Sequence, residues 1–336
     1  MRKIWLLILT VCLLGSCAND IDLFPDNVPS MYMVYGVLDV DDSLQQIKIR
    51  RTFAGEDAQR NLAENSDLFL PDPGIQVFVD EHSKTGSQRF EFNVNNYPKD
   101  NGYFANDRNP VHESFFKPVK GRYYDFTIID PELDEPVTAQ MKAIQTPLIA
   151  YPFNGDAAYN FADTLNPFFF KFSATGEVHL QQFFVNFIEI DNKGDTTYHH
   201  NRFDLRPRFK DSTYRVNYYS KSMTLTYLFN IIRSKIVDKP EVQKRLLHSF
   251  DYTVWAGDQV MSNYLRFAEK FSDNRKMYFS NIENGFGFFA ASSHANIKNI
   301  YPTQPFYDTL IICPVTRDLK FLKYRYKGDF DRGIVQ

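Results

Sequence analysis

Apolar and polar positions alternate at a spacing of two through much of the first half of the chain. Ile47 and Ile49 fall on one face of such a segment, while Lys48 and Arg50 fall on the other. This alternation is typical of a half-buried β-strand. Comparable short segments recur between turn-forming residues, without helical spacing. About seven such strands predict an antiparallel β-sandwich over residues 31–146.

A Thr-Pro pair at residues 146 and 147 ends this run of strands. Proline cannot donate a hydrogen bond to a β-ladder, and it holds the preceding residue in extended geometry. We therefore expect a domain boundary here, with a second β-rich domain over residues 147–330. The predicted fold is mainly β, with two β-sandwich-like domains and a helical insertion in the second.

Strand patterns continue in the second domain. Pro167–Phe172 is densely aromatic, and Gln181–Asp191 is followed by a turn and by a partner segment at Thr196–Arg202. The last two segments predict a hairpin. Apolar residues also predict strands at Ser249–Trp255 and, late in the chain, at Thr309–Val315.

Helical spacing occurs near residues 223–247 and 258–270. In the first region, Leu228 and Ile232 share one helical face, and Pro240 is predicted to start a second helical piece. In the second region, Asp258 can cap the helix that follows it, because a carboxylate accepts hydrogen bonds from the first free amides.

The N-terminal segment predicts export. Two basic residues precede an almost unbroken apolar run, which ends in small residues before Cys17. This order is typical of a secretory signal over residues 1–16, and the run is too short for a bilayer, which takes about 20 residues. Leu14-Gly15-Ser16-Cys17 resembles the lipobox of bacterial lipoproteins. The resemblance implies cleavage between Ser16 and Cys17 and acylation of Cys17.

Residues 17–30 are polar, acidic and interrupted by proline, which predicts a tether to the first domain. Asp20 and Asp22 follow the expected lipid site. They resemble a signal for export to the cell surface in Bacteroidota lipoproteins, although an ordinary solvated linker is the alternative. We expect the outer membrane, with the surface favoured over the periplasmic face.

Composition excludes one class of partner. The formal net charge is -3, and removal of the signal makes it more negative, so no basic face is indicated and we expect no nucleic-acid partner. The 32 Phe and 20 Tyr are typical of strands. Cys12 leaves with the signal and Cys17 is expected to carry lipid, so Cys313 has no intramolecular partner. A buried thiol is the expected state of Cys313.

No motif predicts catalysis. Gly285–Ala290 matches a loose dinucleotide-binding pattern but lacks its strand–turn–helix context, so we interpret it as a strand with glycines at a close approach. Ser292, Ser293 and His294 place hydroxyls beside an imidazole in sequence, which is not the spatial arrangement that catalysis needs. The two catalytic carboxylates of a glycosidase can come from anywhere in a fold, so the sequence neither indicates nor excludes such a pair. We expect no catalytic residues and no enzyme.

Metal ligands are also unconvincing in sequence. The chain has seven histidines, none at zinc-ligand spacing, and the adjacent His199 and His200 point to opposite faces of a strand. Asp39, Asp41 and Asp42 offer oxygen ligands for a hard cation, but a solvated turn at a strand end is the favoured interpretation. We expect no metal and no cofactor.

Exposed aromatic side chains are the remaining recognition candidates, because tyrosine is enriched at binding surfaces. The candidates are Tyr151, Tyr159, Tyr198, Tyr218 and Tyr219. Packing within strands and cores is the favoured alternative.

Together these features resemble a numbered family of Bacteroidota lipoproteins of unknown function. The resemblance is carried by the lipobox, the opening strand Met31–Leu38, the junction Thr138–Pro147 and the late segment Ser280–Ala290. It implies an immunoglobulin-like or carboxypeptidase-regulatory-like sandwich after the lipid anchor, then a second β-rich domain. It also implies an accessory role in surface transport, with an outer-membrane β-barrel transporter as partner.

Three functions follow from the sequence. The main expectation is a non-enzymatic accessory protein held to the membrane through lipid at Cys17. The alternatives are a surface adhesin for glycan or protein, and a hydrolase whose carboxylate pair or Ser-His pair meets only in the fold. The sequence does not predict the identity of the ligand.

Overall fold

The computed structural model describes residues 30–322, apart from 54–58, 101, 103, 106, 154, 156, 164, 211–216 and 271–278. The predicted signal peptide, the cleavage residues Ser16 and Cys17, and the tether up to residue 29 lie outside the described residues. Within the described part, the fold is mainly β with several sheets, as predicted. None of the described helices is long and apolar enough to cross a membrane.

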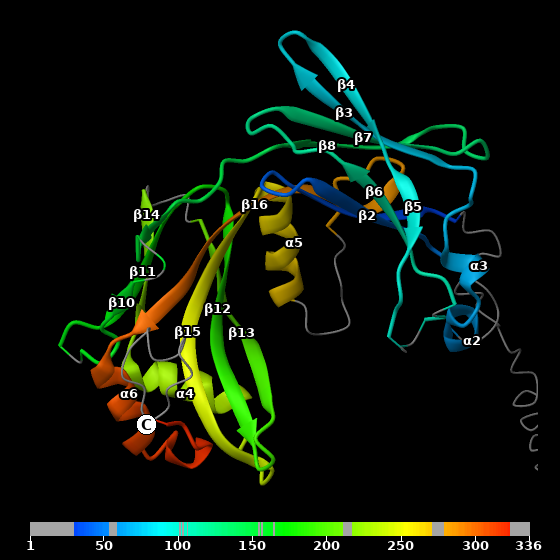
Figure 1. Ribbon diagram of the computed structural model, residues 1–336. Coiled ribbons are helices and arrows are strands. Elements are labelled where there is room, and N and C mark those ends of the chain that lie inside the picture. Colours follow the sequence, from blue (N-terminus) through cyan, green and yellow to red (C-terminus); the bar gives the residue numbers. More distant parts are fainter. Residues whose placement is uncertain are drawn as a thin grey trace, which may run out of the picture.

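The N-terminal lobe comprises residues 30–146 and the first part of a late strand (Figure 1). Its two antiparallel layers have buried alternate residues facing each other. One layer contains β1 (Tyr32–Asp39), β2 (Leu44–Arg51), β6 (Pro110–Phe115) and β5 (Asn93–Asn96). The other contains β4 (Gly86–Glu91), β3 (Gln76–Ser83), β7 (Tyr123–Ile129) and β8 (Val137–Lys142).

The alternation of apolar and polar residues along the strands explains the core of this lobe. Ile47 and Ile49 are fully buried and pack with Val79 and Phe126 from the opposite layer. Burying one aliphatic or aromatic side chain stabilises the fold by about 1.5–3 kcal/mol. The predicted sandwich is therefore confirmed. The polar segment after β2 contains two short helices, α2 (Gln59–Ala63) and α3 (Ser66–Phe69).

The C-terminal lobe contains four long strands opposite a three-stranded sheet. The long strands are β13 (Thr196–Phe209), β12 (Val178–Asp191), β15 (Val242–Gly257) and β16 (Gly285–Pro302). The short sheet contains β14 (Tyr218–Met223), β11 (Phe168–Ser173) and β9 (Ile149–Tyr151), while β10 (Ala158–Tyr159) pairs with the end of β16. The helical elements are α4 (Leu225–Lys235), α5 (Gln259–Lys270), α6 (Gln304–Ile312) and η1 (Arg317–Leu319).

Aromatic stacking joins the layers of the C-terminal lobe. Phe170 of β11 stacks on Tyr252 of β15, with ring centroids 3.9 Å apart. Phe306 of α6 contacts both Phe250 of β15 and Phe229 of α4. Such pairs add about 0.5–1.5 kcal/mol each to the burial of their area. The predicted aromatic strand and the predicted hairpin are both confirmed.

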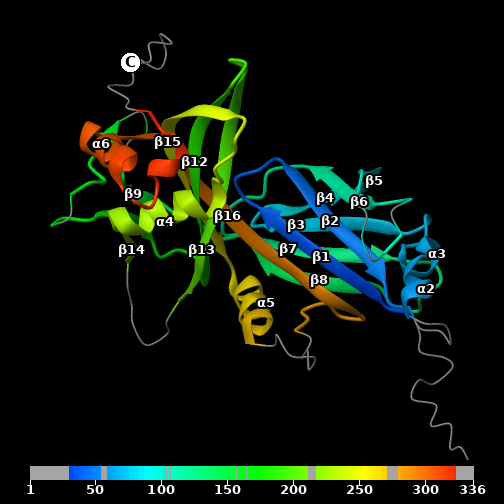
Figure 2. The ribbon, with the colours of Figure 1, turned by 90° about the horizontal axis from the view of Figure 1, so that it is seen from below.

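One strand belongs to both lobes. The first part of β16 pairs in parallel with β1, from Gly285 opposite Tyr32 to Ser292 opposite Asp39. Its second part pairs antiparallel with β15, from Ser292 opposite Gly257 onwards. The result is one nine-stranded sheet that runs from lobe to lobe (Figure 2).

The shared strand corrects the predicted domain ranges. Two cores exist, as expected from a boundary near Pro147, but Ile282, Phe289 and Ala291 pack in the core of the N-terminal lobe. The range 147–330 is therefore not one independent unit.

At Gly287, φ is 106° and an added Cβ would lie 1.9 Å from the carbonyl oxygen of Val34. This confirms the predicted glycine at a close approach of two strands.

The helix predictions are partly wrong. Helices α4 and α5 are confirmed, and Asp258 caps α5 by accepting the amide of Met261. Residues 240 and 241 instead form a turn, and strand β15 begins at Val242, because β12 provides a ladder of partners from there onwards. The predicted strand at Thr309–Val315 overlaps α6, which starts with proline in its first turn and buries Phe306 and Leu310 one helical turn apart.

Candidate functional site

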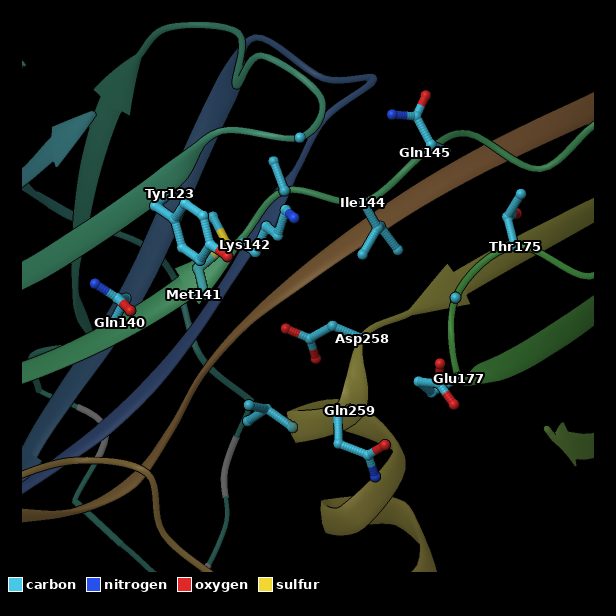
Figure 3. Close-up of a pocket in the computed structure, with 14 residues that line it drawn as sticks. Tyr123, Gln140, Met141, Lys142, Ile144, Gln145, Thr175, Glu177, Asp258 and Gln259 are labelled. Carbon is cyan, nitrogen blue, oxygen red and sulfur yellow. The ribbon is translucent and has the colours of Figure 1, made fainter. Parts of the chain in front are cut away.

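A cleft of about 660 Å³ lies where the two lobes meet (Figure 3). The N-terminal lobe contributes Tyr123 of β7 and a run from Gln140 to Gln145. The C-terminal lobe contributes the turn Thr175–Glu177 and the start of α5, Asp258–Val260. Ligand sites in proteins favour such interfaces between lobes and have volumes of about 300–1,000 Å³.

Apolar side chains make up most of the cleft wall, and amide, hydroxyl and ammonium groups lie among them. Lys142 lies beside Tyr123, with its Nζ 5.1 Å from the ring centroid, and Gln145 lies farther along the same wall. Gln140 donates to Asp125 at 2.8 Å, and Gln259 donates to Asn263 at 2.7 Å. These contacts orient the amide carbonyls, so the cleft presents both donors and acceptors to a polar ligand.

The carboxylate of Asp258 serves the fold at the base of the cleft. Its Oδ1 accepts the Met261 amide at 2.9 Å, and its Oδ2 accepts the Ala291 amide of β16 at 2.8 Å. Asp258 thereby fixes the start of α5 to the shared strand. Burial raises the pKa of Asp258, although these amide hydrogen bonds oppose the rise.

The second carboxylate of the cleft is also engaged. Glu177 pairs with Lys210, with Oε1 and Nζ 2.7 Å apart. Both carboxylates of the cleft therefore have partners within the protein, since Asp258 caps a helix and Glu177 pairs with an ammonium.

A partly buried polar network, the junction cluster, lies where the two lobes are joined. It connects the end of β1, the chain between the lobes and the point where β16 changes partner. Its members are Asp39, Asp41, Lys120, Thr146, Ser292 and His294.

Asp39 is the centre of the junction cluster. Its Oδ2 accepts the Ser292 hydroxyl at 3.1 Å and lies 3.1 Å from Nδ1 of His294. Its Oδ1 accepts the amide of Asp41 at 2.8 Å. The predicted solvated turn is therefore only partly correct, since Asp39 is buried and Asp41 is half-buried while Asp42 is exposed.

Asp41 joins both lobes. It accepts the Thr146 hydroxyl at 2.8 Å and the His294 amide at 3.0 Å, and Nζ of Lys120 lies 3.4 Å away. Burial opposes ionisation, but the Thr146 and His294 hydrogen bonds with the Lys120 charge hold the pKa of Asp41 below its ordinary value. The cluster thus links the end of β1 to the chain between the lobes and to β16.

The other sequence candidates separate in space. His199 and His200 point to opposite faces of β13, where they stack on Phe187 and Phe184. This confirms that the two side chains lie on opposite faces of the strand. Cys313 follows α6 and is half-buried against the C-terminal core, so it is less enclosed than predicted. The Gly285–Ala290 pattern lies within strand β16, without the helix of a dinucleotide site.

Part of the aromatic set gathers on the three-stranded sheet. Tyr151 stacks on Phe169 at 4.7 Å and contacts Phe153, whose side chain is 77% exposed. Tyr218 is exposed on the neighbouring strand. We name these four residues the aromatic face. Of the other candidates, Tyr159 contacts Tyr151, Tyr198 is exposed on β13, and Tyr219 is in the core, as the packing alternative predicted.

Residues 20–298 match the model of one protein family, described as a domain of unknown function (DUF4249). The match covers most of the chain, including the N-terminal lobe, most of the C-terminal lobe and the part of β16 that joins them. The chain belongs to this DUF4249 family. No curated protein matches the chain.

Proposed function

We propose that this DUF4249 protein is a lipid-anchored outer-membrane protein that binds a polar ligand or partner segment in the interlobe cleft. The observation that carries the proposal is the cleft itself. Its volume suits a ligand, its walls combine amides, hydroxyls and an ammonium, and its two carboxylates are engaged elsewhere.

The anchor is proposed at Cys17. It is supported by the basic start, the short apolar run and the small residues before Cys17. Several acyl chains make membrane attachment stable, whereas one chain holds weakly. Labelled palmitate should enter the wild-type protein and the Cys313→Ala variant but not Cys17→Ala. Labelling of Cys17→Ala, or its retention in the membrane fraction, would exclude the anchor.

The accessory role is proposed in a surface transport system, with an outer-membrane β-barrel transporter as the partner. It is supported by the combination of a membrane anchor, two connected lobes and a cleft without an available acid–base pair. Gentle detergent extraction of native membranes, followed by affinity capture, should recover a β-barrel protein. A clean monomer would count against this role. Protease shaving of intact cells would establish the membrane face, and we propose the surface.

The aromatic face supports a second candidate function, that of a surface adhesin for glycan or protein. Phe153 and its stacked neighbours expose apolar rings that a monomeric protein usually buries or uses for contacts. Glycan arrays and host-protein panels at physiological salt test this candidate. Binding that is lost in Phe153→Ser but kept in Phe115→Ser would favour it, because Phe115 is equally exposed on the other lobe.

A further inference from the structure

The junction cluster has the donor set of a metal site. One imidazole nitrogen and two carboxylates, from His294, Asp39 and Asp41, offer ligand atoms that all lie within 4.8 Å of one another. The hydroxyl of Ser292 lies 3.1 Å from the same Asp39 oxygen as the imidazole. Asp39 and Asp41 belong to the end of β1 and its turn, whereas Ser292 and His294 belong to β16.

The distance between His294 and Asp39 suits adjacent ligands of one ion. Two ligands bound about 2.1 Å from an ion lie about 3.0–3.4 Å apart in octahedral or tetrahedral geometry. Nδ1 of His294 and Oδ2 of Asp39 are 3.1 Å apart.

Charge favours a cation. Asp39 is buried and Asp41 is half-buried, which gives two formal negative charges in a region of restricted solvent. Among the described residues, Lys120 is the one ammonium within ion-pair distance of this pair, at 3.4 Å from Asp41. Burying a carboxylate without a compensating charge costs several kcal/mol. A divalent ion beside Asp39 would supply positive charge where the Lys120 ammonium, which pairs with Asp41, does not.

We propose that Asp39, Asp41 and His294 form a binding site for a divalent first-row transition ion that fastens the two lobes together. Two carboxylates and one imidazole suit Mn²⁺ or Zn²⁺, whereas Ca²⁺ prefers an all-oxygen set. In this state Nδ1 of His294 faces the ion, and the ring carries its proton on Nε2. Lys120 stays on the outer side of Asp41, where its side chain reaches solvent.

Calorimetric titration of the full chain, stripped with a chelator and kept in detergent, tests the proposal. Mn²⁺ or Zn²⁺ should bind with one ion per chain, and Ca²⁺ should bind at least tenfold more weakly. His294→Gln and Asp39→Asn should each weaken the binding of the transition ion at least tenfold. Asp42→Asn is the matched control, because Asp42 is an exposed carboxylate in the same turn. It should bind like the wild type.

Spectroscopy and stability make the test independent of whether one variant folds. Co²⁺ in the wild-type site should show an absorption spectrum that changes in His294→Gln, and the ion should raise the Tm of the wild type but not of that variant. Absence of binding by the wild type would overturn the proposal, as would equal binding by all variants. A Tm that depends on pH but is not raised by the ion would also overturn the proposal, and would assign the cluster to hydrogen bonding.

Discussion

Replacing Gly287 by alanine tests whether β16 holds the lobes together. Gly287 is in the parallel pairing with β1, where φ is 106° and an added Cβ would lie 1.9 Å from the carbonyl oxygen of Val34. The contact is with backbone, so it cannot be relieved by a side-chain rotation. Strand β16 must therefore move away from β1 around this position.

The expected loss in the free energy of unfolding has two parts. An alanine at this φ stores about 1–3 kcal/mol of backbone strain. The displaced strands also weaken two or so ladder hydrogen bonds, each worth about 0.5–1.5 kcal/mol. Gly287→Ala should therefore lower the free energy of unfolding by about 2–6 kcal/mol.

Gly194→Ala is the matched control, because Gly194 has a φ of 90° but no atom within 4 Å of an added Cβ. It should cost about 1–2 kcal/mol from backbone strain alone. Urea unfolding followed by far-UV circular dichroism measures both variants. Equal losses in the two variants would refute the close approach of β16 to β1.

Three further predictions concern stability, pH and recognition. Arg245 is fully buried and donates to Glu189 at 2.9 Å, so Arg245→Met should cost about 3 kcal/mol and lower the Tm by roughly 6–12 °C; a Tm within 2 °C or so of wild type in scanning calorimetry would contradict this. Burial lowers the pKa of His112 and His179 to about 4, below the unfolded value near 6.5. Their neutral forms stabilise the fold above pH 6.5 or so, and about 3 kcal/mol each should be lost as pH falls from 6.5 to 4; urea midpoints that do not fall in this range would exclude it. Phe153→Ser should leave the urea midpoint unchanged, because the ring is exposed, while removing any glycan or protein binding by the aromatic face; a large loss of stability would place Phe153 in the core.

Strand positions could be predicted where one face is buried and the other is solvated. The alternation at Ile47 and Ile49 works because those side chains face the opposite layer of the sandwich. The cap at Asp258 could also be predicted, since it depends on residues within one helical turn.

Local patterns failed where tertiary pairing decided the conformation. The Leu-Leu pair at 246 and 247 fits a helix as well as a strand, and pairing with β12 selects the strand. Around residues 309–315, an apolar run without clear alternation fits either state, and packing of Phe306 on Phe250 and Phe229 selects the helix.

The candidate sites could not be predicted, because their residues meet only through the topology. The cleft combines segments from both lobes, and Ser292 and Asp39 are separated by 253 positions in the chain. Parallel pairing of β1 with β16 brings them together, and no spacing in the sequence encodes that pairing. Asp39 and Asp41, spaced as D-x-D, were the part of this ligand set that the sequence could indicate. The third ligand, His294, could not be predicted from its position in the chain.

Site-specific photo-crosslinking in living cells tests the central claim that the interlobe cleft binds a partner or ligand. A photoreactive residue at Gln145, on the cleft wall, should give a specific adduct in the outer-membrane fraction. The same residue at Lys193, in the exposed turn after β12, should give none. No adduct at Gln145, or identical adducts at both positions, would contradict a binding function for the cleft.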